Sequence, residues 1–372
     1  MPYRIVHIAD VHLDTAFRGL DPALGIARRK QLEDAFERAL DLARDRRADA
    51  LCIAGDLYES GRTTPDRGAY LARVLGAVAP MRVFISPGNH DPYDAPSLYR
   101  QTAFPPNVTI FTTRAFAPVR LADGLTLWGA AHEFALDRNP ILNDGFTCEG
   151  AGTHLLLFHG SDRDHVPPGK DCIAPFVDAD VARAGATHAM VGHYHGQLSG
   201  PHYAYPGSLE PLNAAQDGRH TAAVVTTDRG AVNVEFVELN RTRYVDEDFD
   251  VSDYADRAAL ASALFDRLNA LAARPGEVFC RVRLVGNAPA SLDLDAAQLQ
   301  RECAGRFPGA TIEDLAAAID PQEAAHEGHT VRALFARDML ERIAKASDAE
   351  KPTLQLALRY GLQAFAGKRL AP

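Results

Sequence analysis

Five short motifs rich in Asp, Asn and His are spread over the first half of the chain. Their side chains offer carboxylate and amide oxygens and imidazole nitrogens, with no thiolate among them. That donor set suits Mn²⁺, iron or Zn²⁺ with open coordination positions rather than a closed structural zinc site. The pattern therefore predicts a metal centre built from Asp10-Val11-His12, Gly55-Asp56, Gly88-Asn89-His90-Asp91, His159-Gly160 and Gly192-His193-Tyr194-His195.

The spacing within these motifs favours shared ligands. In an extended segment, residues two apart face the same way. Asp10 and His12 can therefore hold one ion together, and His193 and His195 can face one cleft. The glycines of the motifs permit tight turns and a close approach of the backbone.

Each motif follows an apolar run that predicts a buried strand. The runs are RIVHIA, ALCIA, RVFIS, HLLLF and HAMV. In an open α/β sheet the carboxyl ends of the strands gather in one crevice, so motifs far apart in the sequence can converge there. We expect strands at Tyr3–Ala9, Ala50–Ala54, Arg82–Ser86, Leu125–Ala130, His154–Phe158, His188–Val191, Ala222–Thr226 and Val232–Val237.

Amphipathic stretches between the first strands predict helices over Arg28–Arg46 and Asp66–Val78. A strand-helix-strand-helix-strand order is typical of an α/β layered core. The later strands lie closer together with fewer helices between them. We therefore expect an α/β fold with mixed sheets.

An acidic, polar stretch at Arg243–Asp253 predicts the boundary between two domains. Residues 1–245 would form the catalytic domain, and residues 250–372 a smaller α+β accessory or capping domain with helices near its C-terminal end. Within it we expect helices over Tyr254–Ala273 and Asp295–Arg306, strands at Val278–Val285 and near Thr311–Leu315, and two final helices that form a hairpin. The apolar positions of this hairpin are Val331, Leu334, Phe335, Met339, Leu340, Ile343, Leu354, Leu358, Leu362 and Phe365.

The composition narrows the class of protein. A length of 372 residues predicts about two domains, and no apolar stretch approaches the roughly 20 residues needed to span a bilayer. The five cysteines are scattered and odd in number, which favours reduced thiols in a cytoplasmic protein. A net charge of -10, nearly all of it before residue 250, gives no sign of nucleic-acid binding. It does not exclude such binding, because phosphate contacts depend on local patches and bound metal.

Other polar residues near the motifs have simpler interpretations. Asp14 and Asp91 are expected to cap turns or support ligands. Arg18, Arg62 and Arg163 are expected at the solvated surface, with phosphate contact as the alternative. A core or surface position is expected for seven further histidines, which are His7, His132, His154, His165, His188, His202 and His220. For His132 the alternative is that its side chain lines the cleft.

The motif order D-x-H, G-D, G-N-H-D, H-G and G-H-x-H resembles the signature of the calcineurin-like metallophosphoesterase superfamily. The segments HIADVHLDTAFRGL, IAGDLYES, SPGNHDPY, FHGS, GHYHG and YPGSLEPLN are similar to bacterial SbcD and YhaO-type DNA repair exonucleases, relatives of the Mre nuclease subunit. The resemblance covers roughly residues 1–240. It implies a layered sandwich of mixed β-sheets flanked by helices.

The resemblance also implies a role for each motif. Two divalent ions would be bound, with manganese the expected metal and iron, zinc and magnesium the alternatives. A bridging carboxylate, Asp56, would help to hold the ions about 3.5–4 Å apart for in-line attack on phosphorus. The first ion would be held by Asp10, His12 and His195, and the second by Asn89, His159 and His193.

His90 follows a predicted ligand directly and is our candidate for protonating the leaving oxygen or stabilising the transition state. Glu59 departs from the pattern of several Mre-type nucleases, which carry a histidine there. The protein phosphatases carry an acidic residue at that position, which orients the catalytic histidine. We therefore expect Glu59 to hydrogen-bond His90 and keep it protonated.

The resemblance implies an enzyme, a manganese-dependent DNA exonuclease or endonuclease that works in DNA repair with a coiled-coil SMC-like ATPase. DNA would be its substrate, and no membrane would be involved. The resemblance is compatible with a homodimer. The C-terminal hairpin would dock the ATPase, unless its apolar faces pack on the accessory domain. Two alternatives are a phosphodiesterase or phosphatase for small nucleotides, and a DNA-binding or scaffolding subunit with a vestigial metal centre.

Overall fold

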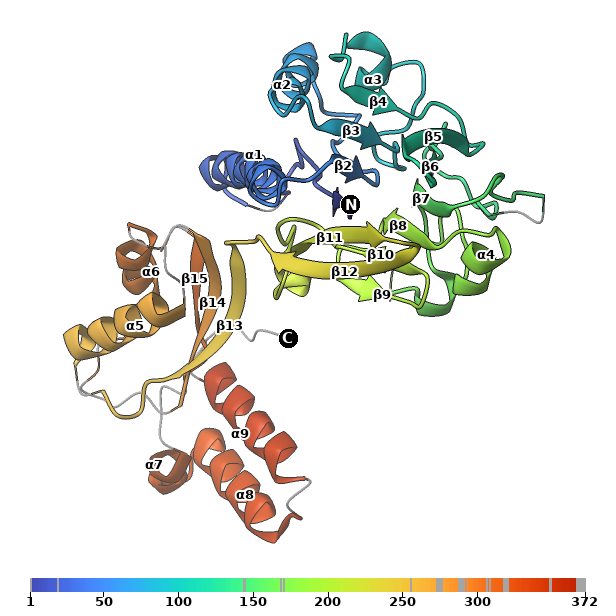
Figure 1. Ribbon diagram of the computed structural model, residues 1–372. Coiled ribbons are helices and arrows are strands. Elements are labelled where there is room, and N and C mark those ends of the chain that lie inside the picture. Colours follow the sequence, from blue (N-terminus) through green and yellow to red (C-terminus); the bar gives the residue numbers. More distant parts are fainter. Residues whose placement is uncertain are drawn as a thin grey trace. The chain divides into compact units, whose positions relative to one another are not determined.

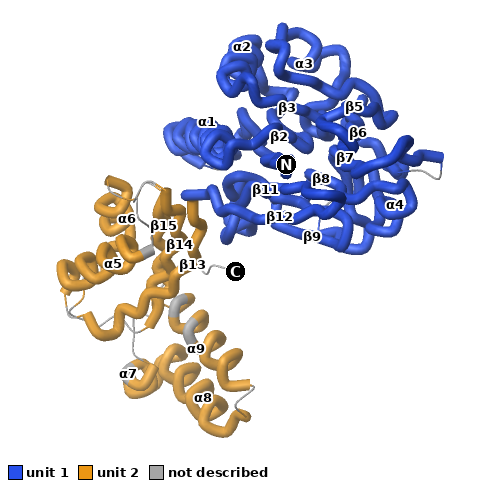
Figure 2. The backbone as a smooth tube through the Cα atoms, in the orientation of Figure 1, with its two compact units in different colours: residues 1–241 blue, residues 242–372 orange. Residues whose placement is uncertain are grey.

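Two mixed β-sheets pack face to face in residues 1–241, the first of two compact units in the computed structural model (Figure 2). The second unit comprises residues 242–372. Among the described residues, no helix is long and apolar enough to cross a membrane. The structure describes residues 2–18, 20–142, 145–167, 169, 171–254, 256–271, 277–286, 292, 294–305, 307, 309–316, 321–347 and 350–365.

The first sheet has the strand order β12-β11-β1-β2-β3-β4 (Figure 1). Strands β1 to β4 run parallel, and β11 and β12 add two antiparallel neighbours beside β1. Because β1, β2 and β3 are parallel, their carboxyl ends lie at one edge. The strands are β1 (Tyr3–Ile8), β2 (Ala50–Ile53), β3 (Arg82–Ile85), β4 (Val108–Ile110), β11 (Thr221–Asp228) and β12 (Ala231–Glu238).

The second sheet has the order β5-β6-β7-β8-β10-β9. Its four central strands are parallel and its two edge strands antiparallel. Every residue of the central strands β7 and β8 is buried, which explains their continuous apolar runs. The strands are β5 (Ala117–Ala122), β6 (Leu125–Gly129), β7 (Thr153–His159), β8 (His188–Gly192), β9 (Leu198–Ser199) and β10 (Tyr203–Tyr205).

Helices cover the outer faces of the sandwich. Helices α1 (Pro22–Asp45) and α2 (Pro65–Gly76) bury their apolar stripes against the first sheet, and α4 (Asp178–Arg183) packs on the second. The prediction placed the start of α1 too late. The helix begins at Pro22 because the Asp21 carboxylate caps it by accepting from Ala23 N, and proline suits the first helical position.

The second unit contains a parallel three-stranded sheet with β13 (Arg243–Asp250) at one edge. The predicted boundary segment is therefore a strand along most of its length. Its acidic side chains are paired across the sheet, Asp246 with Arg281 and Asp248 with Arg283, which makes a charged edge strand stable. The other elements of this sheet and its covering layer are β14 (Val278–Val285), β15 (Gly309–Asp314), α5 (Arg257–Leu271) and α6 (Ala296–Ala304).

The last three helices form a separate hydrophobic cluster. They are α7 (Pro321–His326), α8 (Val331–Lys345) and α9 (Lys351–Phe365), and a short α3 (Leu98–Gln101) belongs to the first unit. The buried members of the cluster share none of the residues that form the core beneath β13, β14 and β15. The predicted fold class, an α/β sandwich of mixed sheets flanked by helices with a smaller C-terminal α+β region, is confirmed.

Two histidines lie in the apolar layer between the sheets. Neither ring nitrogen of His7, on β1, has a hydrogen-bond partner among the described residues, and the same is true of Nε2 of His188, on β8. Burial lowers the pKa of His7 to about 3 and that of His188 to about 4. Both rings are therefore neutral in the folded protein.

We predict that this pair makes the fold sensitive to acid. Below pH ~6.5 the unfolded chain binds protons that the folded chain excludes, so the free energy of unfolding falls as the pH drops toward 4. The slope is at most about 1.4 kcal/mol per pH unit for each histidine. His7→Leu should reduce the slope, as measured by urea unfolding between pH 7 and 5 in a chelator. His329→Leu, at an exposed position, is the control, and equal slopes in all three proteins would contradict the prediction.

Candidate metal centre

The ends of five buried strands bring the motif residues to one place. Asp10 and His12 follow β1, Asp56 follows β2 and Asn89 follows β3, all in the first sheet. In the second sheet, His159 ends β7, and β8 is followed directly by the segment with His193 and His195. The structure brings all seven predicted metal ligands together, although they are spread over most of the first unit.

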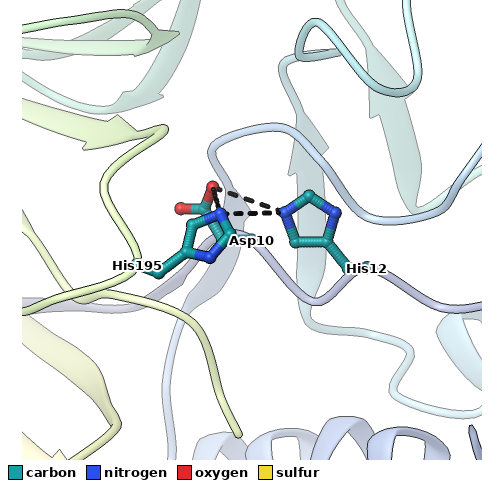
Figure 3. Close-up of side chains that lie close together, drawn as sticks. All are labelled: Asp10, His12 and His195. Atoms are coloured by element: carbon teal, nitrogen blue, oxygen red, sulfur yellow. Dashed lines mark hydrogen bonds and ion pairs between the residues drawn. The ribbon is translucent and has the colours of Figure 1, made fainter. Parts of the chain in front are cut away.

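One cluster contains Asp10, His12 and His195 (Figure 3). The Nε2 atoms of the two histidines are 3.2 Å apart. Asp10 Oδ1 lies 3.9 Å from His12 Nε2 and 3.7 Å from His195 Nε2. Both oxygens of Asp10 accept a hydrogen bond from the backbone N–H of His193, which fixes the carboxylate in place.

A second cluster contains Asp56, His159 and His193. His159 Nε2 lies 3.0 Å from Asn89 Oδ1 and 3.3 Å from Asp56 Oδ2. The same Asp56 oxygen lies 3.6 Å from Nε2 of His12 in the first cluster. Asp56 therefore stands between the two clusters, in the position that a bridging carboxylate needs.

Several residues of the centre have backbone conformations that residues with a Cβ atom rarely adopt. Asp10, His12, Asp56 and His193 all have a positive φ, at 52°, 50°, 52° and 116°. A residue other than glycine rarely adopts this region, and such strain concentrates at functional sites. Gly55 shares it at 80°, and a Cβ atom there would stand 2.5 Å from Nδ1 of His159.

Hydrogen bonds behind the clusters orient the rings. His159 Nδ1 lies 2.8 Å from the carbonyl oxygen of Ala54, so its N–H donates there and Nε2 faces the cluster. His12 Nδ1 donates to Glu59 Oε1 at 2.7 Å, which also leaves Nε2 facing the cluster. Histidines that bind metals are typically held in this way by a carbonyl or carboxylate.

Asp91 holds three segments of the centre together. Its buried carboxylate accepts from the backbone N–H groups of Gly88, Asp56 and Leu57 and from the hydroxyl of Tyr99. It thereby fixes the turn after β2 to the turn after β3. This agrees with the expected supporting role and shows how Asp56 and Asn89 are brought to one another.

Glu59 contacts two histidines. Besides His12, its carboxylate reaches His90, whose Nδ1 lies 3.0 Å from Glu59 Oε2. Although burial opposes a charged ring, Glu59 and Asp56 raise the pKa of His90 to about 9. Although burial also opposes ionisation of Glu59, the two histidines lower its pKa to about 2. Without bound metal, His90 is therefore a cation at neutral pH.

The donor set fits divalent cations. Burial raises the pKa of Asp10. Burial opposes ionisation of Asp56 as well, but His159 and the other imidazoles hold the pKa of Asp56 well below its usual range. Two buried carboxylates, four imidazoles and one amide oxygen converge here with no lysine or arginine among them. Cations coordinated by Asp10, His12, Asp56, Asn89, His159, His193 and His195 would satisfy these lone pairs.

Three contacts of the centre went unnoticed in the sequence. The Gln216 amide nitrogen lies 2.9 Å from His195 Nδ1, and the Asp171 carbonyl oxygen lies 3.1 Å from His193 Nε2. Glu59 was expected beside His90 but not beside His12. His132, for which the cleft was the alternative, is buried and hydrogen-bonded through Nε2 to the carbonyl oxygen of His159.

Comparison with known proteins defines the class to which this fold and site belong. The model of the calcineurin-like phosphoesterase family matches residues 3–197, more than half of the chain. The chain therefore belongs to this family of metallophosphoesterase hydrolases, which use divalent metals, and the predicted resemblance is confirmed.

Individual relatives are 24% to 27% identical to this chain in sequence. The uncharacterized metallophosphoesterase YhaO of Bacillus subtilis is 24% identical over 335 residues, which are 87% of this chain and 78% of YhaO. The DNA double-strand break repair protein Mre11 of Methanopyrus kandleri is 26% identical over 64% of this chain and 58% of its own. Mre11 of Aeropyrum pernix is 27% identical over 57% of this chain and 55% of its own. The chain thus spans little more than half the length of both Mre11 proteins.

We predict that changes at Asp56 and His90 separate metal binding from chemistry. Asp56→Asn should lower the affinity for metal by at least the roughly 10–100-fold that changes behind the ligands cause, so fewer ions should be bound per chain at limiting metal. His90→Ala should keep the metal and slow cleavage of a phosphodiester with an alkoxide leaving group about 10²–10⁴-fold, because it removes the positioned acid. Mass spectrometry of bound metal and steady-state kinetics measure the two effects.

Glu59→Gln tests whether His90 acts through Glu59. Glu59→Gln should slow cleavage less than His90→Ala does. The loss of activation free energy in the double variant should be smaller than the sum of the losses in the two single variants. Strictly additive losses would show that the two residues act independently. Near-normal activity of Asp56→Asn at limiting metal would remove Asp56 as the bridging ligand.

Proposed function

We propose that this protein is a two-metal phosphodiesterase that cleaves DNA, a manganese-dependent exonuclease or endonuclease of DNA repair. The observation that carries the proposal is the position of the Asp56 carboxylate between two clusters of imidazole and oxygen ligands. The DNA substrate is supported by similarity to two Mre11 proteins, whose name describes double-strand break repair.

The chain's own residues account for orientation and proton transfer. Two divalent cations, when bound, lower the pKa of a water molecule and neutralise charge on the phosphoryl oxygens. Asp10, Asp56 and the ligand histidines keep their geometry because backbone N–H and carbonyl groups hold them. The site therefore needs little reorganisation during the reaction.

His90 is placed to serve the leaving group. Its Nδ1–H is taken by Glu59, so the proton on Nε2 is the one available for donation. The hydrogen bond to the Glu59 carboxylate favours the charged ring, and the positive charge would also stabilise a developing oxyanion. Glu59 is the positioning residue, since it orients His90 and supports His12.

We further propose that helices α8 and α9 bind a coiled-coil SMC-like ATPase. Most of their apolar residues pack on each other and on α7, not on the core beneath β13, β14 and β15. Val331 and Leu334 are nevertheless 71% and 54% exposed on α8. They lie three residues apart, so they occupy the same face of the helix, as in a helix-in-groove contact.

A nuclease assay tests the proposed activity. The full-length protein with Mn²⁺ should shorten or cut DNA with defined ends, and chelator should abolish the reaction. Asp56→Asn is the matched control for a contaminating nuclease, because it removes only the proposed bridge. Cleavage of bis(p-nitrophenyl) phosphate without any on DNA would favour a small nucleotide as substrate. Far fewer than two ions per chain and no cleavage would indicate a vestigial centre.

A truncation tests the partner. Because the cluster of α7, α8 and α9 shares no buried residue with the core of the sheet, a chain that ends at Ala316 should stay soluble and cleave the chromogenic diester. It should not co-purify with the ATPase. Val331→Glu with Leu334→Glu should abolish binding of the partner without truncation, while Arg342→Glu is a control on the same helix. Undiminished partner binding in both altered proteins would remove the docking proposal.

A further inference from the structure

A hollow of 460 Å³ is lined in part by residues that follow those of the candidate metal centre closely in the sequence. Among the residues that the structure describes, its lining is formed by Asp14, Arg29, Gly61 and Arg62. Asp14 is two residues after the predicted ligand His12, and Arg62 is three residues after Glu59. Arg29 comes from helix α1.

Backbone hydrogen bonds join the hollow to the metal centre. The segments after β1 and β2 run side by side, with His12 N donating to Asp56 O at 2.9 Å and Glu59 N to Leu13 O at 2.9 Å. Arg62 N donates to Glu59 O at 3.0 Å and closes a turn. The Cα atoms that span such a turn are less than about 7 Å apart, so Arg62 is a close neighbour of the Glu59 that supports His12 and His90.

The charged residues that line this hollow differ in their partners. The Asp14 carboxylate is paired with Arg67, through contacts of 2.9 and 2.7 Å, and the same guanidinium also pairs with Glu33 at 2.8 Å. Arg29 and Arg62 have no hydrogen bond or ion pair from their side chains to any part of the chain that the structure describes. Two guanidinium groups are therefore available to a ligand, and Arg29 is half-buried.

This positive site stands out in an acidic protein. The net charge is -10, nearly all of it before residue 250, yet two unpaired arginines lie beside a centre that would act on a phosphodiester. Arginine presents donors in a rigid fork that matches two oxygens of a phosphate. A substrate with a single phosphate would leave this hollow unused.

We propose that Arg29 and Arg62 bind a non-scissile phosphate of a polynucleotide strand whose neighbouring phosphate is at the metal centre. The inference rests on the proposed function and adds to it a second phosphate-binding site, formed by two named arginines. Successive phosphates of one strand rise about 3.4 Å along the axis of B-DNA, so a strand in the centre carries its next phosphates close by.

The test compares arginines inside and outside the hollow. The double variant R29Q/R62Q should lower kcat/KM on single-stranded oligothymidylate roughly 10- to 100-fold more than on bis(p-nitrophenyl) phosphate, the loss expected for charge-assisted hydrogen bonds. The slope of log(kcat/KM) against log salt concentration should weaken by about 0.7 for each phosphate that an arginine no longer neutralises. R29K/R62K should retain part of the discrimination, because lysine keeps the charge without the fork.

Binding without metal gives a second readout. In chelator, R29Q/R62Q should bind fluorescent oligothymidylate more weakly than the wild type, by roughly the same factor as the fall in kcat/KM, because the same charge-assisted hydrogen bonds are removed. R47Q/R229Q is the matched control, because it also removes two positive charges, from the exposed turn between β11 and β12 and from a position beyond the far end of α1. That end lies about 24 Å from Arg29 at 1.5 Å per residue.

The outcomes separate this inference from the proposed function. If the wild type cleaves and binds oligonucleotides and R29Q/R62Q behaves like R47Q/R229Q, the phosphate site is wrong and the nuclease proposal stands. If the wild type cleaves only the small diester and does not bind oligonucleotides, the nuclease proposal fails and the phosphate site fails with it. A selective loss in R29Q/R62Q, partly restored in R29K/R62K, supports both.

Discussion

The structure depends on one constraint, which is that carboxylates and imidazoles must be buried together around Asp56 without a compensating lysine or arginine. Burying an ionised group without a partner is costly, so an arrangement of this kind is stable only if cations or protons balance it. One Asp56 oxygen accepts from the backbone of His90, and the other faces His12 and His159. The strained backbone at Asp10, His12 and Asp56 is what places these groups so close together.

The sandwich supplies the rigidity that this constraint requires. Both sheets present the carboxyl ends of buried parallel strands at the centre, so each ligand follows directly from an element that cannot shift without disturbing the core. Asp91 ties together the turns after β2 and β3, and the Asp10 carboxylate ties the first sheet to the His193 backbone of the second. The centre is therefore also a junction between the sheets.

Much of the fold and of the candidate site followed from local patterns. Apolar runs that end in Asp, Asn or His predicted both the strands and the residues that converge at their ends. This was possible because the end of a strand and the type of a ligand residue can both be recognised within a short segment. The contacts of Gln216 with His195 and of Glu59 with His12 join segments distant in sequence, so spacing gave no signal for them. Strand β13 looked like a polar boundary because its arginine partners, Arg281 and Arg283, lie 35 residues further along the chain.

Ion pairs and hydrogen bonds also explain how charge is distributed around the centre. Asp14, an acidic residue close to the first cluster, pairs with Arg67, and Glu59 pairs with His90 and accepts a hydrogen bond from His12. With these carboxylates satisfied, the guanidinium groups of Arg29 and Arg62 are not needed for internal pairing. A protein with an overall negative charge can therefore present a local positive surface to a phosphate chain, because attraction at contact distance depends on unpaired neighbours and not on net charge.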